Sequence, residues 1–473
     1  MLFISDEFLV FLLVVGGFMA VLRHRGARRW LLLAACVWFY ASWSIGFLGL
    51  LLGNIVFDYV IALRLGDEVA PSRRKALVIA SISLNLGMLA VFKYAGFAAR
   101  SLNGGLTLLG TSWSVPVPEL ILPLGISFYV FQAISYTVDV YKGLLRPTRS
   151  LLDLATFILF FPHLVSGPIV RAAEILPQLE RLDRPAPLDE VIEGARGFVE
   201  GFARKVLVAD TLAVLADTTF GAPVQYGAGD LAIGLAAYTF QIYFDFSGYS
   251  QMAVGVARMF GVHFPDNFDA PYISRSLQEF WRRWHISLSR FLRDYLYIPL
   301  GGSRHGPLRT VAAMSATMII GGFWHGANWT FVAWGALHGF GQAIAWIYRE
   351  RFRGPDAARF WDSALGDVCG WVLTMGVVTL GWVYFRATDI HAAHVYLLRM
   401  LSGASGASAL DLSALQVATF AAAVAVHFVA RWRPAWSVPW PRRPLWAGLA
   451  VGGVYVALTA LKQADAPFIY FNF

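Results

Sequence analysis

Long apolar runs constrain the fold of this chain more than any other feature of its sequence. A helix needs about 20 consecutive apolar residues to cross the hydrocarbon core of a bilayer. Many stretches of the chain approach that length, 57% of its residues are hydrophobic and only 14% are charged, whereas about 25% are charged in a typical soluble domain. The sequence therefore predicts an all-α integral membrane protein that crosses the bilayer many times.

The apolar runs predict roughly ten to twelve transmembrane or re-entrant helices. The runs Asn54–Leu65 and Val311–Phe323 are too short to span the bilayer unaided. Short helices are tolerated at membrane depth only where protein or a water-filled cavity surrounds them, so we expect a compact body with an internal recess. The other expected spans are Phe8–Leu22, Trp30–Leu51, Ala76–Phe97, Leu122–Tyr141, Leu151–Val170, Leu231–Phe260, Trp329–Ile347, Val368–Phe385, Leu415–Val429 and Leu445–Leu461.

Basic residues gather between the apolar runs, and the chain carries a net charge of +8. Loops rich in lysine and arginine face the cytoplasm in membrane proteins, so we interpret this pattern as membrane topology and expect no nucleic-acid partner. On that basis the N-terminus and the tail that ends at Phe473 lie on the outer face. The basic groups are Arg23, Arg25, Arg28 and Arg29, then Arg349, Arg351 and Arg353, and finally Arg431, Arg433, Arg442 and Arg443.

The first stretch that could carry chemistry is Ser274–Gly302, which contains FWRRWH at residues 280–285. We expect one helix over Leu277–Tyr297, in which aromatic residues recur at helical spacing. One interpretation is an amphipathic helix that lies on the membrane surface, with tryptophan at the interface.

A functional interpretation of the same helix uses its arginines. Arg282 and Arg283 would attract a phosphorylated ligand such as coenzyme A. Trp281 and Trp284 would line the same donor site, and His285 would point inward toward the donor. Helical periodicity alone leaves the surface and the donor-site interpretations open.

The second stretch, Met318–Gly339, contains GGFWHG and places Trp324 and His325 between glycines. An imidazole keeps hydrogen-bonding capacity that hydrocarbon cannot satisfy, and intramembrane ionisable groups are often functional. Glycines allow close helix packing or close approach of a ligand. His325 is therefore either a core histidine with its hydrogen bonds satisfied or a catalytic group. His338 lies on a rotated face, and we interpret it as a structural or supporting residue.

Two further groups of polar residues are weaker candidates. Asp245 lies in an apolar helix and needs a partner, an arginine or a histidine, so it either braces helices or lines the donor site. His391 and His394 have a spacing that metal ligands can use, but the sequence offers no third or fourth ligand, so we expect no metal site.

The last six residues, FIYFNF at Phe468–Phe473, carry four aromatic side chains. An aromatic anchor at the membrane interface is one interpretation. The other is a tail that folds back into the protein as a plug and presents the hydroxyl of Tyr470 inside.

Taken together, these stretches resemble the membrane-bound O-acyltransferase family. The similarity is to the bacterial branch typified by the alginate O-acetyltransferase and by the membrane protein of teichoic-acid D-alanylation. It covers most of the chain and is densest over Tyr243–Gly339, through FDFSGYSQMAVGVARMFG, NFDAPYISRSLQEFWRRWHISLSRFLRDYLYIPLGG and GGFWHGANWTFVAWGALHG. The earlier PLGISFYVFQAISYTVDVYKG and FPHLVSGPI are similar too, whereas the tail departs from the pattern with Asn472 where glutamine is common.

The resemblance implies a single domain over residues 1–473 built around a central funnel. A catalytic core segment at 244–339 and an aromatic tail at 464–473 lie within it. His325 corresponds to the essential histidine of the family and His285 to its second histidine. Tyr470 matches a tyrosine that is proposed as an acyl relay in related systems.

The resemblance further implies transfer of an acyl group, expected to be acetyl, from a cytoplasmic thioester. The donor would be acetyl-coenzyme A, no cofactor would be bound, and the protein would lie in the bacterial inner membrane. The group would reach an exported polysaccharide such as alginate through a periplasmic acetyltransferase partner. Two alternatives stay open. One is D-alanyl transfer to teichoic acid from a carrier-protein thioester, and the other is a proton-coupled transporter in which the histidines relay protons.

Overall fold

The computed structural model describes residues 1–68, 70–165, 167–182, 184–352, 354–429, 444–461 and 468–469. Within these residues the regular structure is helical, and the β contact that occurs is an isolated bridge between Tyr226 and Ser408. The all-α prediction is confirmed. The chain separates into two compact units, Met1–Phe198 with Met252–Pro265 and Val199–Gln251 with Asp266–Phe473. The prediction of one domain over residues 1–473 remains a prediction.

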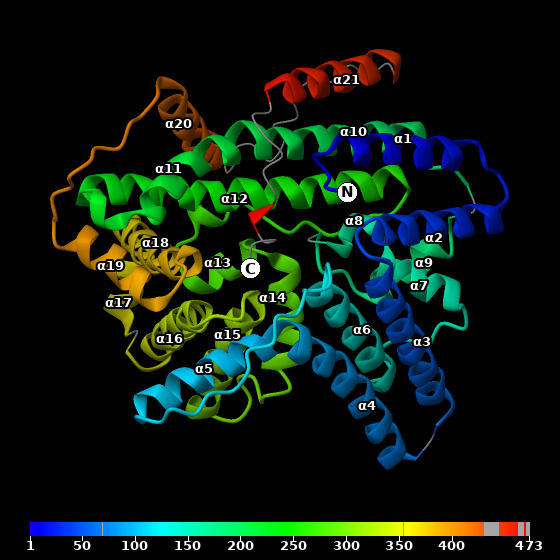
Figure 1. Ribbon diagram of the computed structural model, residues 1–473, viewed down its shortest axis with the longest axis horizontal. Coiled ribbons are helices and arrows are strands. Elements are labelled where there is room, and N and C mark those ends of the chain that lie inside the picture. The colour runs from blue at the N-terminus through cyan, green and yellow to red at the C-terminus, as the bar shows by residue number, and fades with distance from the viewer. Residues whose placement is uncertain are drawn as a thin grey trace. The chain divides into compact units, whose positions relative to one another are not determined.

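Unit one is a set of helices in which α3, α4 and α6 contact one another (Figure 1). A polar cluster of α3 and α4 is buried, and Ser81 of this cluster also donates to Thr137 of α6 at 2.9 Å. The Asp58 carboxylate accepts hydrogen bonds from Ser81 Oγ at 2.6 Å and from Asn85 Nδ2 at 2.9 Å, and Asn54 Nδ2 donates to Asn85 Oδ1 at 3.1 Å. The elements are α1 Asp6–Val21, α2 Arg25–Ala41, α3 Ile45–Asp67, α4 Pro71–Leu89, a π-helical turn Ala90–Tyr94, α5 Ala95–Leu108, α6 Ile126–Tyr141, α7 Leu151–Leu159, α8 Phe161–Leu164 and α9 Ala172–Leu179.

Two of the arginines that the sequence placed in a basic loop are structural in unit one. Arg28 is buried and donates to the carbonyls of Met19 and Leu22, which lie at the C-terminal end of α1 and have no partner within that helix. Arg29 forms an ion pair with Asp153 of α7. These contacts join α2 to α1 and α7, so charge counts overstate how many arginines are free to face a membrane surface.

In unit two, α15 and α16 are in close contact, and α18 packs against α16 (Figure 1). Helices α10 Leu188–Ala203 and α12 Ala228–Met259 have residues in both units. The remaining elements of unit two are a π-helical turn Arg204–Ala209, α11 Asp210–Gly221, a short turn Pro223–Gln225, a short turn Pro271–Ile273, α13 Leu277–Arg283, α14 Ile286–Leu292, a π-helical turn Arg293–Tyr297, α15 Pro307–His325, α16 Trp329–Arg351, α17 Pro355–Trp361, α18 Ala364–Arg386, α19 Ile390–Leu401, α20 Ala414–Val429 and α21 Pro444–Leu461.

Glycines set the spacing of α15 and α16. A Cβ atom on Gly322 would lie 2.3 Å from the Phe331 carbonyl oxygen, and one on Gly335 would lie 2.4 Å from the Met318 carbonyl oxygen. No side chain fits at either point, so the two backbones approach more closely than larger residues would allow. The glycines that surround His325 therefore serve helix packing.

Three helical stretches within the described residues are long and apolar enough to cross a membrane. They are Ile45–Asp67, Pro71–Leu108 and Ala364–Arg386. Two shorter apolar helices, Ala414–Val429 and Trp446–Leu461, accompany them. The apolar helices fit a multi-pass membrane protein. Most of the other expected spans coincide with helices that are shorter or less apolar than a helix that crosses a bilayer by itself.

Three expected spans are wrong in their bounds. The run Asn54–Leu65 is not a short helix, because it is part of the 23-residue helix α3, which is long enough to cross a membrane. The run Trp30–Leu51 is divided, because Ser44 accepts the backbone N–H of Phe47 at 3.4 Å and starts α3. The run Leu151–Val170 ends as a helix at Leu159, where Phe160 turns the chain before Pro162. Proline has no N–H for the helical ladder and clashes with the preceding turn. Apolar character continued through both breaks, so composition could not reveal them.

Candidate active site

The predicted helix over Leu277–Tyr297 is wrong, because the chain turns at Trp284 and His285. Helix α13 ends at Arg283, α14 begins at Ile286, and His285 between them has φ +43°. A residue other than glycine in this left-handed region costs of order 1–3 kcal/mol and persists only where the surroundings hold it. The turn takes His285 out of the helical row in which periodicity had placed it.

Asn267 holds this turn in place. Its backbone carbonyl accepts the N–H of Ile286 at 3.0 Å. Its side-chain Oδ1 accepts the N–H of Ser287 at 3.2 Å and the Ser287 hydroxyl at 2.9 Å. Asn267 thus satisfies the first turn of α14, whose N–H groups have no partner within the helix. In turn, Asn267 Nδ2 donates to Ser250 Oγ at 3.2 Å.

The same amide fixes the tautomer of His285. The N–H of Ser287 can only donate, so the Asn267 atom that it meets is the oxygen. Nδ1 of His285 lies 3.1 Å from that oxygen and must therefore carry the proton. In the neutral ring Nε2 then holds a lone pair and accepts. His285 is a hydrogen-bond acceptor at its free nitrogen.

His285 lies outside the three long apolar helices, and apolar side chains surround it. It is fully buried, the Phe246 ring meets it edge-on at 4.7 Å, and burial lowers its pKa to about 3. Its Nε2 has no hydrogen-bond partner among the described residues. The ring is therefore neutral near pH 7 and offers one acceptor nitrogen to a ligand.

His325 is the last residue of α15 and is buried among aromatic rings. Its neighbours are Trp324 at 5.0 Å, Trp334 of α16 at 5.2 Å and Phe385 of α18 at 5.3 Å between ring centroids. Helices α15, α16 and α18 therefore together position this imidazole.

Trp281 and Trp284 belong to the aromatic cluster that extends toward His325. Trp281 lies 5.6 Å from Trp334 and 5.3 Å from His338, and Trp284 lies 4.9 Å from Trp382. We call Trp281, Trp284, Trp334, Trp382 and His338 the tryptophan cluster. Trp334 also contacts His325, so the cluster connects the FWRRWH segment to the FWHG segment.

A cavity of about 390 Å³ adjoins the cluster at Trp281. Arg293 and Arg349 bring two guanidinium groups to its wall. Arg293 is paired with Asp294 at 2.6 Å, and Arg349 lies 3.9 Å from the carboxylate of Glu350. The lining residues are Gln278, Trp281, Ser289, Leu292, Arg293, Tyr297, Ser303, Met314, Thr317, Met318, Gln342, Trp346 and Arg349.

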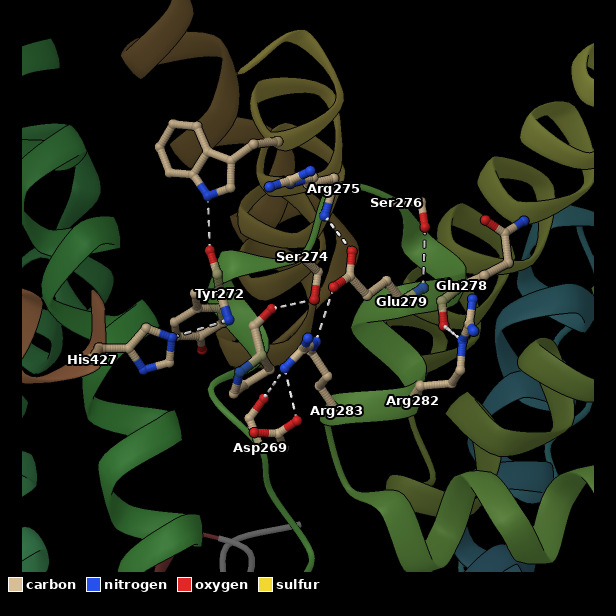
Figure 2. A network of polar contacts seen from close by, with 12 residues as sticks. Asp269, Tyr272, Ser274, Arg275, Ser276, Gln278, Glu279, Arg282, Arg283 and His427 are labelled. Carbon is tan, nitrogen blue, oxygen red and sulfur yellow. Dashed lines mark hydrogen bonds and ion pairs between the residues drawn. The ribbon is translucent and has the colours of Figure 1, made fainter. Parts of the chain in front are cut away.

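Arg282 and Arg283 have other surroundings. Figure 2 shows Arg283 between two carboxylates, Asp269 at 2.7 Å and Glu279 at 3.0 Å. Arg282 is exposed, and its Nε donates to the Gln278 carbonyl at 3.2 Å. Arg283 thus fastens α13 to the chain before it, and the prediction that both arginines bind the donor stays a prediction.

Asp245 pairs with a lysine, where we had expected an arginine or a histidine. Lys205 Nζ lies 2.7 Å from Asp245 and 2.7 Å from Asp210, and the lysine and Asp245 side chains are both buried. The second oxygen of Asp245 accepts the backbone N–H of Ile469 at 2.8 Å. Asp245 therefore braces helices and also holds the tail.

The described part of the tail lies against the wall of the His285 site. Phe468 stacks on Tyr249 at 4.7 Å and lies 5.5 Å from Phe246, whose ring also meets His285. Tyr470, the predicted relay, lies outside the described residues. The contacts of residues 468 and 469 favour the interpretation in which the tail folds back into the protein.

Comparison with known proteins places the chain in a family. Residues 144–385 match the model of the membrane-bound O-acyltransferase family. The chain is 42% identical to the probable alginate O-acetylase AlgI of Azotobacter vinelandii, over 99% of this chain and 90% of the relative. It is 43% identical to the probable alginate O-acetylase AlgI of Pseudomonas putida, over 89% of this chain and 85% of the relative.

A peptidoglycan O-acetyltransferase of Helicobacter pylori is 36% identical over 82% of this chain and 76% of the relative. These similarities extend well beyond single motifs, and the apolar helices agree with them. The chain belongs to the membrane-bound O-acyltransferase family and is a multi-pass membrane O-acyltransferase.

Proposed function

We propose that this protein takes an acetyl group from acetyl-coenzyme A on the cytoplasmic side of the bacterial inner membrane and delivers it toward an exported polysaccharide. The observation that carries the proposal is the buried, neutral His285 whose free Nε2 accepts, beside the ring that also contacts the tail. Relatives named as alginate and peptidoglycan O-acetylating proteins support acetyl as the group transferred.

The donor would bind in the cavity at Trp281. Its volume of about 390 Å³ lies within the range of ligand pockets, about 300–1,000 Å³. Arg349 and Arg293 suit the phosphates of coenzyme A, because one guanidinium group can donate two parallel hydrogen bonds to the oxygens of a phosphate. Trp281 belongs both to the cavity wall and to the tryptophan cluster, so a thioester that reached past it would approach His325.

Transfer then needs a hydroxyl that loses its proton as it attacks the thioester carbonyl. His325 would take that proton as general base. His285 would orient the donor by accepting a hydrogen bond from it at Nε2, since a neutral ring that carries its proton on Nδ1 cannot donate to a developing oxyanion from Nε2. The thiol of coenzyme A would leave with the proton, and an ester would remain.

The first acceptor would be Tyr470. Asp245 accepts the backbone N–H of Ile469, the residue before it, and Phe468 contacts the ring of Phe246, which also contacts His285. A periplasmic partner enzyme would then move the acetyl group from the tyrosine ester to a polysaccharide hydroxyl. This relay explains how a cytoplasmic donor modifies an exported polymer.

The test of His325 is the acetyl content of the exported polymer in cells that carry His325→Ala. We expect loss of acetylation at normal protein level. His394→Ala is the matched control, because His394 is exposed and contacts the ring of Tyr384, which does not belong to the tryptophan cluster. Near-normal acetylation by His325→Ala would exclude the general-base role.

The test of the relay is Tyr470→Phe, which keeps the ring and removes the hydroxyl. We expect the polymer to lose its acetyl groups while the protein still hydrolyses acetyl-coenzyme A, with water as the acceptor in place of the tyrosine hydroxyl. Normal acetylation would make the tail an anchor only.

A further inference from the structure

The FDFSGY stretch of α12 carries three buried side chains that meet the C-terminal tail. Asp245, Phe246 and Tyr249 lie within about one turn of this helix, and residues three or four positions apart share a helix face. The tail residues against them are Phe468, which is 2% exposed, and Ile469, which is 7% exposed. We call Asp245, Phe246 and Tyr249 the tail-binding surface.

This surface holds two successive tail residues by different kinds of contact. The Asp245 carboxylate accepts the backbone N–H of Ile469 at 2.8 Å. The Phe468 ring stacks on Tyr249 with 4.7 Å between centroids and 27° between planes, and it lies 5.5 Å from the Phe246 ring. A backbone hydrogen bond beside a ring stack fixes the register of the tail on α12.

The hydrogen bond from the tail completes the environment of a buried carboxylate. A buried charge is costly unless it is both paired and hydrogen-bonded. Lys205 Nζ lies 2.7 Å from Oδ1 of Asp245, and the N–H of Ile469 is the hydrogen-bond donor that the described residues offer to Oδ2. Asp245 is therefore fully satisfied only when the tail is bound.

The fold also places the lysine deliberately close. A Cβ atom on Gly248 of α12 would lie 2.7 Å from the Gly201 carbonyl oxygen and 3.3 Å from the backbone nitrogen of Lys205. Glycine thus lets the π-helical turn Arg204–Ala209, which carries Lys205, approach α12. Turns of this kind are frequent at functional sites.

Phe246 connects the surface to the candidate active site, because its ring also contacts His285 at 4.7 Å. We propose that the tail-binding surface positions the tail as the acyl acceptor, and that Asp245, held by Lys205, is a positioning residue that fixes the backbone one residue before Tyr470. The proposal rests on the proposed function and gives the relay tail its binding site. The surface itself makes and breaks no bond of the reaction.

The first experiment removes the donor on the tail. Proline has no N–H, so Ile469→Pro deletes the hydrogen bond to Asp245, and Ile469→Val, which keeps it, is the matched control. The measurement is the rate of radiolabel transfer from acetyl-coenzyme A to the tail of purified protein, beside the rate of acetyl-coenzyme A hydrolysis. We expect Ile469→Pro to label its tail about 10-fold to 10²-fold more slowly, the worth of a hydrogen bond to a charged group, while hydrolysis persists.

Two outcomes of this experiment would overturn the proposal. One is equal labelling of the tail in Ile469→Pro and Ile469→Val. The other is a parallel loss of labelling and hydrolysis in Ile469→Pro, which is the result that a purely structural role predicts.

The second experiment measures tail binding without any reaction. Lys205→Met with Asp245→Leu removes the acceptor and leaves no unpaired charge at residues 205 and 245, whereas Lys205→Met with Asp245→Asn keeps an acceptor oxygen. Amide hydrogen exchange of the C-terminal peptide reports local opening. We expect exchange at Ile469 to be about tenfold faster in the leucine variant than in the asparagine variant.

Equal exchange in the two double variants would overturn the tail-binding surface. Protection that depends on Asp245 in a wild-type protein that transfers no label would contradict the proposed function and uphold the binding of the tail. The two failures are thereby distinguished.

Discussion

The glycine contact between α15 and α16 makes a sharp prediction for Gly322→Ala. The new methyl would lie 2.3 Å from the Phe331 carbonyl oxygen and 3.0 Å from Gly335 Cα, both of them backbone atoms that cannot rotate away. Carbon and a carbonyl oxygen ordinarily approach to about 3.3 Å. The two helices must therefore separate by about 1 Å at this point.

That separation acts directly on the candidate site. His325 lies three residues after Gly322 on α15, and its neighbour Trp334 lies on α16. Overpacking of this kind costs about 1–3 kcal/mol of stability, and misplacement of a catalytic group by about 1 Å can lower a rate about 10²-fold. We expect Gly322→Ala to remain folded in detergent and to transfer acetyl about 10²-fold more slowly.

The assay is the initial rate of acetyl transfer, corrected for the folded fraction measured by size-exclusion chromatography. Gly321→Ala is the control on the neighbouring residue, because its methyl meets only the end of the Leu292 side chain at 3.0 Å, which can move. It should retain most of the rate. A Gly322→Ala rate equal to that of Gly321→Ala would refute the argument that this helix spacing positions His325.

Two further predictions concern buried charge. Lys205→Met leaves the carboxylates of Asp245 and Asp210 without their cation, so the unfolding free energy should fall by about 3–5 kcal/mol in a denaturant titration. Adding Asp245→Asn should recover part of that loss, and no recovery would contradict the pairing. The second prediction concerns pH. The pKa of His285 is about 3 in the folded protein and about 6.5 in an unfolded chain. The contribution of the neutral His285 ring to stability is therefore present above pH 6.5 and is lost as the pH falls toward 3. Melting temperatures measured from pH 7 to pH 5 should therefore fall more steeply for the wild type than for His285→Gln, and parallel curves would contradict the buried neutral ring.

The sequence predicted the helical class well, because apolar composition is a property of the whole chain. It also singled out FWRRWH and FWHG as separate candidate segments, and the structure connects them through the contacts of Trp281 with Trp334 and of Trp334 with His325. It missed the turn at His285, since the residue that imposes it, Asn267, lies 18 positions away. Periodicity describes neighbours within a helix and contains no information on such a distant hydrogen bond.

The missed partner of Asp245 has the same origin. Lys205 is 40 residues earlier, so no spacing within a helix links it to Asp245. The surroundings of His325 depend on α15, α16 and α18 meeting, so no local pattern predicts them. What the sequence did provide was the residue types, namely histidine and tryptophan in an apolar setting, that make such a site worth examining.

The central claim is acetyl transfer from coenzyme A with His325 as base, and it is tested most directly with purified protein. The measurement follows radiolabel from acetyl-coenzyme A onto the protein and onto added acceptor, for the wild type, His325→Ala and His394→Ala. The account predicts label with the wild type and with His394→Ala, and none with His325→Ala. Label from a carrier-protein thioester alone would point to D-alanyl-type chemistry, and equal labelling by His325→Ala would contradict the account.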